Sequence, residues 1–222
     1  MESAVDQALT TADGGHRSRV GEARRARTRA RILAAAVRVF TTKGRYGLVI
    51  DDFIQAAGVS RGTFYNYFPS VDALFEEASR WLEDDLMVSI ETALAPLSDP
   101  VDRLATGVRL WLKKAEADRE WCAFVAQNDR RGENVEQSVM RDLADGRDAG
   151  AFRFASIDAA RDLLVGTLRE AMVRLARGGA TPRHADDVAR TVLAGLGLEP
   201  RAIDDQMNRA LPPMRRPART IT

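Results

Sequence analysis

Apolar residues recur along most of this chain every three to four positions, the spacing that places them on one face of an α-helix. An early example is the stripe of Ile32, Ala36, Val37 and Phe40, which is followed by Gly44, a common helix stop. The pattern predicts helices over residues 22–44, 51–57, 61–67, 71–95, 101–117, 121–125, 135–147, 158–177, 182–196 and 200–211. No segment of any length alternates as a half-buried strand would, so we expect an all-α fold.

Breaks in this pattern suggest four segments. Residues 1–22 show no periodicity and are predicted to be a disordered basic arm. Residues 23–70 contain three short helices and end at Pro69-Ser70, a helix-breaking step. Longer helices fill residues 71–211, and the proline-rich residues 212–222 are predicted to be a disordered tail.

Charge is distributed unevenly between these segments. The net charge is only +1, but residues 17–70 carry eleven Arg or Lys against three Asp or Glu, whereas residues 71–222 have a net charge of −4. A basic N-terminal block ahead of a mildly acidic body is typical of a nucleic-acid-binding domain joined to a domain of another kind. The alternative is an ordinary solvated charged face.

Composition argues against several other classes of protein. The chain has 222 residues, a single cysteine (Cys122) and two histidines (His16 and His184), and we find no glycine-rich phosphate loop or metal-ligand spacing. We therefore expect neither enzymatic activity nor a bound metal or cofactor. No purely apolar run exceeds six residues, and the first thirty residues lack an apolar signal stretch. We expect a cytoplasmic protein without a membrane span.

The predicted second and third helices form a helix-turn-helix around the turn Ala57-Gly58-Val59. The third helix has the size that fits the major groove of DNA, where Arg61 can pair with guanine and Asn66 can read adenine. Tyrosine hydroxyls suit phosphate oxygens better than bases. The candidate DNA contacts are Arg29, Ser60, Arg61, Gly62, Thr63, Tyr65, Asn66 and Tyr67. The alternative is a compact helical core with no role in nucleic-acid binding.

Residues 29–82 resemble the DNA-binding domain of the TetR family of bacterial transcriptional regulators. The resemblance is strongest over residues 56–68 and rests on Arg31-Ile32-Leu33, Ala35-Ala36, Phe40, Gly44, Ala57-Gly58-Val59-Ser60, Gly62-Thr63-Phe64-Tyr65, Tyr67-Phe68, Ser70 and Ala73-Leu74. It implies a homodimer, formed here through residues 158–196, that binds a pseudo-palindromic site on double-stranded DNA. It also implies repression as the default activity, and release by a small-molecule effector that binds in the helical body.

Two positions depart from the family pattern. Val49 stands where the family usually has a threonine that can cap the next helix, and Val71 stands where it usually has a lysine. We expect both valines to weaken binding to the phosphate backbone, and the arginines of residues 17–29 to be able to replace the lost phosphate contacts. The alternative interpretation is a TetR-like protein without specific DNA binding that serves as a ligand-binding or protein-interaction module.

The effector site is indicated only by large apolar residues in the body. The candidates are Trp81, Trp111, Trp121, Phe124, Met140 and Phe152. Such residues at helical spacing are also what any helical core requires, so the alternative for each is a plain packing role. A pocket lined by them would be largely apolar.

Overall fold

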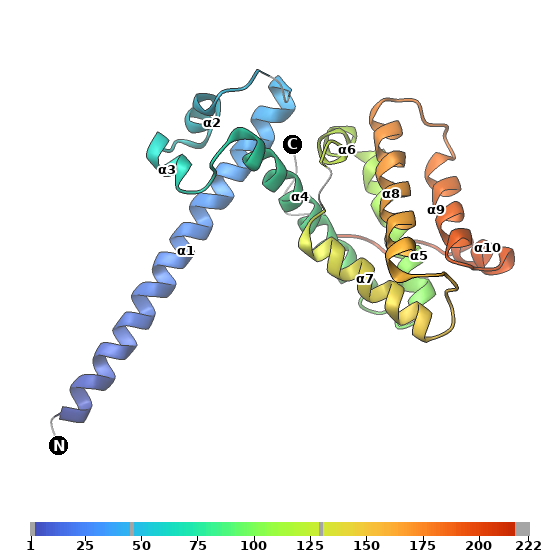
Figure 1. Ribbon diagram of the computed structural model, residues 1–222, viewed down its shortest axis with the longest axis horizontal. Coiled ribbons are helices and arrows are strands. Elements are labelled where there is room, and N and C mark those ends of the chain that lie inside the picture. The colour runs from blue at the N-terminus through green and yellow to red at the C-terminus, as the bar shows by residue number, and fades with distance from the viewer. Residues whose placement is uncertain (1–2, 45–46, 129–130, 216–222) are drawn as a thin grey trace. The chain divides into compact units, whose positions relative to one another are not determined.

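The computed structural model describes residues 3–44, 47–128 and 131–215, with side chains described from Arg19 onward. These residues contain helices and no strand, which confirms the all-α prediction. The helices are α1 (Ser3–Lys43), α2 (Ile50–Ala57), α3 (Arg61–Tyr65), α4 (Val71–Leu94), α5 (Pro100–Ala117), α6 (Arg119–Ala126), α7 (Glu133–Asp148), α8 (Ile157–Ala176), α9 (His184–Gly195) and α10 (Pro200–Asn208) (Figure 1).

The chain divides into two compact units, which we call the head (Met1–Phe75) and the body (Glu76–Thr222). The division falls inside α4, whereas the sequence pattern placed it at the start of that helix. The first turn of α4 therefore belongs to the head, since Leu74 and Phe75 are buried there.

Helix α1 begins earlier than the sequence pattern indicated. The arm expected at residues 1–22 is helical from Ser3 onward, so the prediction of a disordered segment is corrected for residues 3–22. The segment contains no proline, and it leads into a run of alanine and arginine, both strong helix formers. A glycine costs a helix only about 1 kcal/mol, so Gly21 does not end it. Hydrophobic periodicity misses such a helix because one without a packing face shows no apolar stripe.

The head is built around aromatic side chains. The ring of Phe40 on α1 lies 4.9 Å from that of Phe53 on α2 and 5.1 Å from that of Phe75. Phe64 on α3 and Phe68 are also buried, with their ring centroids 6.0 Å apart. Edge and tilted ring contacts of this kind stabilise beyond the area they bury, so they hold α2 and the start of α4 against α1, and Phe68 against α3.

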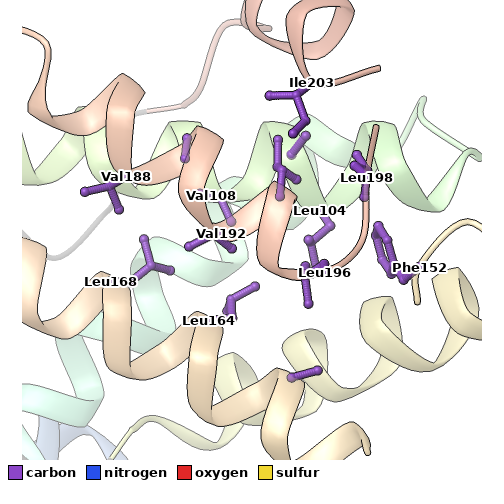
Figure 2. Packing of buried hydrophobic residues seen from close by; sticks show 14 of the residues in the cluster. Leu104, Val108, Phe152, Leu164, Leu168, Val188, Val192, Leu196, Leu198 and Ile203 are labelled. Carbon is purple, nitrogen blue, oxygen red and sulfur yellow. The ribbon is translucent and has the colours of Figure 1, made fainter. Parts of the chain in front are cut away.

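The core of the body is a cluster of hydrophobic residues contributed by α5, α7, α8, α9, α10 and the segments that follow α7 and α9. Figure 2 shows that its side chains converge between these helices; the labelled members are Leu104, Val108, Phe152, Leu164, Leu168, Val188, Val192, Leu196, Leu198 and Ile203. Close approach at two glycines makes this packing possible. A Cβ on Gly146 would lie 2.1 Å from the Phe152 ring, and Gly197 has a φ of +88° and would place a Cβ 2.7 Å from the carbonyl oxygen of Arg153.

The tail expected at residues 212–222 is only partly described. Helix α10 ends at Asn208 rather than near Leu211, and residues 211–215 have no regular secondary structure. Residues 216–222 lie outside the described part of the chain.

Candidate nucleic-acid interface and body cavity

The turn between α2 and α3 has the geometry of a helix-turn-helix. Gly58 ends α2 in the left-handed conformation, with φ of 60° and ψ of 45°, which glycine adopts without steric cost. The amide of Val59 donates to the carbonyl of Ile54, closing the end of α2. Ser60 then starts α3, since its hydroxyl accepts a hydrogen bond of 3.1 Å from the amide of Thr63. Ser60 thus acts first as a helix cap, which positions the candidate recognition helix.

Helix α3 exposes most of the residues predicted to contact DNA. Arg61, Gly62, Tyr65 and Asn66 are exposed, and nothing lies within 4 Å of a Cβ built on Gly62. Asn66 is the last residue of the helical turn, and its amide donates to the carbonyl of Gly62. The hydroxyls of Thr63 and Ser60 lie 2.8 Å apart. The structure therefore brings these side chains together on one short helix, as the sequence pattern indicated.

Two predicted contacts lie beside α3 rather than on its exposed face. Tyr67 is half-buried, and its ring lies 6.4 Å from that of Phe68. The guanidinium of Arg29, on α1, lies 5.8 Å from the centroid of the Phe68 ring. A cation at this distance from an aromatic ring is attracted to it. Arg29 is itself exposed, so its charge remains available at the surface.

The start of α2 shows how the chain accommodates valine at position 49. Val49 is 60% exposed, and its side chain has no atom that can accept a hydrogen bond. Asp52 supplies the missing interaction instead: its carboxylate accepts from the Val49 amide at 3.0 Å and from the Lys43 ammonium at 2.5 Å. The hydrogen bond from Lys43, together with that amide, lowers the pKa of Asp52 below its usual value. The helix end is therefore stabilised without a residue that could also bind phosphate.

Asp51, the neighbouring acid, contacts the recognition helix. Its two carboxylate oxygens lie 2.6 and 2.7 Å from Nη2 of Arg61. Sequence reasoning assigned Arg61 to guanine but missed this partner, because the two residues are ten positions apart and lie on different helices. At the other departure from the family pattern, Val71 begins α4, where the Ser70 hydroxyl accepts from the Ala73 amide at 3.1 Å.

The body contains a partly open, largely apolar cavity of about 70 Å³. Its walls come from four helices, α4, α5, α7 and α8, and the segment before α7. The apolar lining consists of Met87, Ile90, Leu94, Leu104, Val108, Trp111, Val135, Val139, Leu164, Val165, Leu168 and Met172. A cavity needs roughly 10–15 Å³ to hold one water molecule, so this space admits a small molecule of a few heavy atoms unless side chains move.

Charged side chains also reach the cavity. Glu91 and Asp142 line it, and both accept hydrogen bonds from Arg103 and Arg141. Burial raises the pKa of Asp142, whereas hydrogen bonds from the two arginines outweigh burial at Glu91 and lower its pKa. Ion pairs therefore already satisfy both carboxylates.

A second, buried ion pair lies beside the cavity. Arg131 lines the cavity and pairs with Glu83 of α4, whose side chain has no exposed surface. Glu83 also accepts a 2.8 Å hydrogen bond from the Gly132 amide. Burial raises the pKa of Glu83 to about 7, against the opposing charge of Arg131. Sequence reasoning missed this pair, although a glutamate between Leu82 and Leu86 in an apolar stripe signals a buried charge.

Of the six residues predicted to line an effector site, Trp111 lines the cavity. Trp121 and Phe124 are buried in α6, where the Trp121 ring lies 5.6 Å from that of Trp111. Phe152 belongs to the hydrophobic core of the body. Trp81 and Met140 are partly buried on α4 and α7 and are not part of the cavity lining. Helical spacing identified these as inward-facing residues but did not separate cavity wall from core.

Over the described ranges, no cluster of three or more His, Cys, Asp or Glu side chains is arranged to hold a metal ion. Among the described helices, none combines the length and the apolar character needed to cross a membrane. Cys122 is buried, and burial raises the pKa of its thiol to about 11.

Comparison with known proteins places this geometry in context. Residues 32–78 match the family model of "Bacterial regulatory proteins, tetR family". The HTH-type transcriptional regulator LmrA of Bacillus subtilis is 28% identical over 106 residues, which is 47% of this chain and 52% of LmrA. The HTH-type transcriptional activator FasR of Mycolicibacterium smegmatis is 28% identical over 101 residues, or 46% of each chain. The matches thus span about half of the length of these curated relatives.

The similarity to solved structures includes the body as well as the head. The crystal structure of RolR without ligand superposes with a TM-score of 0.71 and 22% identity, covering 84% of this chain and all of RolR. At this identity the likeness shows the fold alone. The family match over α1 to α4 and the exposed recognition helix agree on one point: residues 32–78 of this chain form an N-terminal helix-turn-helix domain similar to that of the bacterial regulatory proteins of the tetR family.

Proposed function

We propose that this protein is a sequence-specific transcriptional regulator, acting as a repressor, that binds a pseudo-palindromic operator as a homodimer and is released by a small, largely apolar ligand. The observation that carries the proposal is the head itself. A capped recognition helix presents Arg61, Tyr65 and Asn66 outward, next to a turn that leaves room for close approach to DNA. Such a helix reads few bases, so two copies must combine to define an operator.

In-vitro selection from a random duplex pool tests specific binding. We expect the purified, ligand-free protein to enrich an inverted repeat whose half-sites lie about one helical turn apart or somewhat more. A reporter gene placed behind the selected site then tests the direction of regulation, and we expect expression to fall. Enrichment of no sequence, with only salt-sensitive general binding, would refute the proposal.

Residues 158–196, which include α8 and α9, are the proposed dimer interface. Gly166 supports this assignment because it is exposed on α8 and has nothing within 4 Å of a built Cβ. A larger side chain there fits the single chain but blocks close approach of a second copy. We expect Gly166→Leu to reduce dimer formation in sedimentation experiments while the circular dichroism of the helices is retained. Gly62→Leu is the matched control for dimer formation, because Gly62 also has open space around a built Cβ and lies outside residues 158–196. Gly150 is not used, because its positive φ would strain any larger residue.

The cavity beneath Trp111 is the proposed effector site. Its small volume and apolar walls favour a compact ligand, and the solved complex of RolR with resorcinol shows that a protein of this fold can hold a small aromatic molecule. We expect resorcinol and related small phenols to enter as the lining side chains shift, to change the tryptophan fluorescence and to release operator DNA. Val139→Trp should abolish both responses by filling the cavity. Val173→Trp, at a partly buried α8 valine outside the cavity lining, is the matched control.

The second candidate function is a ligand-binding or protein-interaction module without specific DNA binding. It is favoured by Val49, which is exposed and offers no hydrogen bond to phosphate, and by Val71 at the start of α4. The double variant Val49→Thr with Val71→Lys distinguishes the two. If that variant selects a sequence and the parent selects none, the second candidate is correct.

A further inference from the structure

Asp51 and Arg61 form the ion pair that ties α2 to the side chain at the start of the recognition helix. Both carboxylate oxygens of Asp51 bind the same nitrogen, Nη2, at 2.6 and 2.7 Å. The Arg61 and Asp51 side chains are 59% and 54% exposed, so the pair lies at the surface of the head. An exposed ion pair contributes little to folding stability. The main consequence of this pair is therefore that it restricts the direction of the Arg61 side chain.

The geometry leaves part of the guanidinium available. Within the described residues, Nε and Nη1 of Arg61 have no hydrogen-bond partner, because Asp51 takes only Nη2. Guanine presents two acceptors, O6 and N7, at its major-groove edge. Each pair of parallel N–H groups on a guanidinium includes Nη2, so with Nη2 held by Asp51 the arginine donates to one of these acceptors through Nε or Nη1. A free arginine side chain samples many rotamers, and ordering it on binding reduces affinity.

We propose that Asp51 is a positioning residue that orients the Arg61 guanidinium for guanine readout. The inference rests on the proposed function, since it assumes that α3 enters the major groove. Asp51 lies in the first turn of α2, whose other end is fixed by the Gly58 turn and the buried Phe53, so the carboxylate is held on a rigid element. Pairing with Arg61 also neutralises an acid that would otherwise face the phosphates, where an isolated negative charge is unfavourable.

Asp52 shows that the two adjacent acids have separate tasks. Its carboxylate binds Lys43 and the Val49 amide, on the side of α2 that meets α1. Asp52 therefore stabilises the start of α2, whereas Asp51 is the acid that binds Arg61. Because the acids point to different partners, substitution of Asp51 alone removes the interaction with the recognition helix and leaves the cap of α2 in place.

Base preference is the decisive readout. Using the selected operator, affinities of the full-length protein are measured for duplexes that differ at one base pair of each half-site. Arg61→Ala identifies the position that Arg61 reads. Asp51→Ala is then compared with Asp72→Ala, which removes an acid of the same charge from the first turn of α4 rather than from α2.

We expect Asp51→Ala to reduce the preference for guanine at the Arg61 position by about fivefold, the effect of losing one well-placed hydrogen bond. Preferences at other positions should not change, and Asp72→Ala should leave all of them as in the parent. A merely structural role would lower affinity for every duplex equally and would overturn the proposal. Tighter binding with guanine preference intact would also overturn it, since Asp51 would then be masking Arg61. If the parent selects no sequence, the proposed function fails as well; if only the Asp51 result is negative, the proposed function stands.

Discussion

The buried pair of Glu83 and Arg131 makes the stability of the body depend on pH in a defined direction. Burial raises the pKa of Glu83 in the folded protein to about 7, from 4.5 for the ordinary side chain. Between these values the folded state binds more protons than the unfolded state, so the free energy of unfolding falls as pH rises. Above pH 7 the folded state carries the full cost of the buried charge. Each unit of pKa difference corresponds to about 1.4 kcal/mol, and the difference here therefore amounts to about 3 kcal/mol.

Glu83→Gln is the perturbation that isolates this contribution. Glutamine keeps an oxygen that can accept from the Gly132 amide but does not titrate. The variant leaves Arg131 without its carboxylate, so its absolute stability will be lower and only the pH dependence is to be compared. We expect the parent to lose about 3 kcal/mol relative to the variant between about pH 4.5 and pH 8.

Chemical denaturation at a series of pH values gives the measurement. The protein concentration must be held constant, because a dimer gains apparent stability with concentration. Arg131→Met provides a second test: with its cationic partner removed, Glu83 should resist ionisation further and extend the fall in stability to higher pH. If the difference between parent and Glu83→Gln does not vary with pH, or if the parent gains stability as pH rises, then Arg131 holds Glu83 ionised throughout and the reasoning is refuted.

Three further predictions concern packing and DNA binding. Gly146→Ala should destabilise the body by about 1–3 kcal/mol, because its Cβ would lie 2.1 Å from the Phe152 ring. Gly166→Ala, where nothing lies within 4 Å of the new Cβ, should not destabilise the monomer. Thermal unfolding of the two variants in a dissociated sample makes the comparison. Deletion of residues 1–26 should weaken DNA binding and reduce its salt dependence by about one unit of slope for each phosphate that the arm neutralises, and an unchanged slope in titrations would show that the arm does not bind DNA. Val49→Thr should tighten operator binding at every sequence alike, since a threonine hydroxyl contacts phosphate rather than bases; a change in base preference instead would contradict that role.

Local sequence signals predicted the turn and the helix caps of the head. The run from Ala57 to Ser60 predicted the turn, and Gly58 does adopt the left-handed conformation that only glycine takes readily. Ser60 and Ser70 cap α3 and α4, as short-range hydrogen bonding requires. Such features depend on residues a few positions apart, so the sequence contains what is needed to predict them. The start of α1 was misjudged because hydrophobic periodicity detects a helix only through the face it buries.

Contacts between residues far apart in the sequence determine the cavity lining and the ion pairs. Trp111 and Trp121 both lie at helical spacing, but only the packing of α5 against α7 and α8 places Trp111 at the cavity. Glu83 meets its arginine across 48 residues of chain, and Asp51 reaches Arg61 across the turn of the helix-turn-helix. The sequence by itself determined the helices, the turn and the basic character of the head, because these follow from short-range periodicity, capping and charge. Which inward-facing residues enclose a cavity and which charges pair was decided only by the tertiary structure, since both depend on how separate helices approach one another.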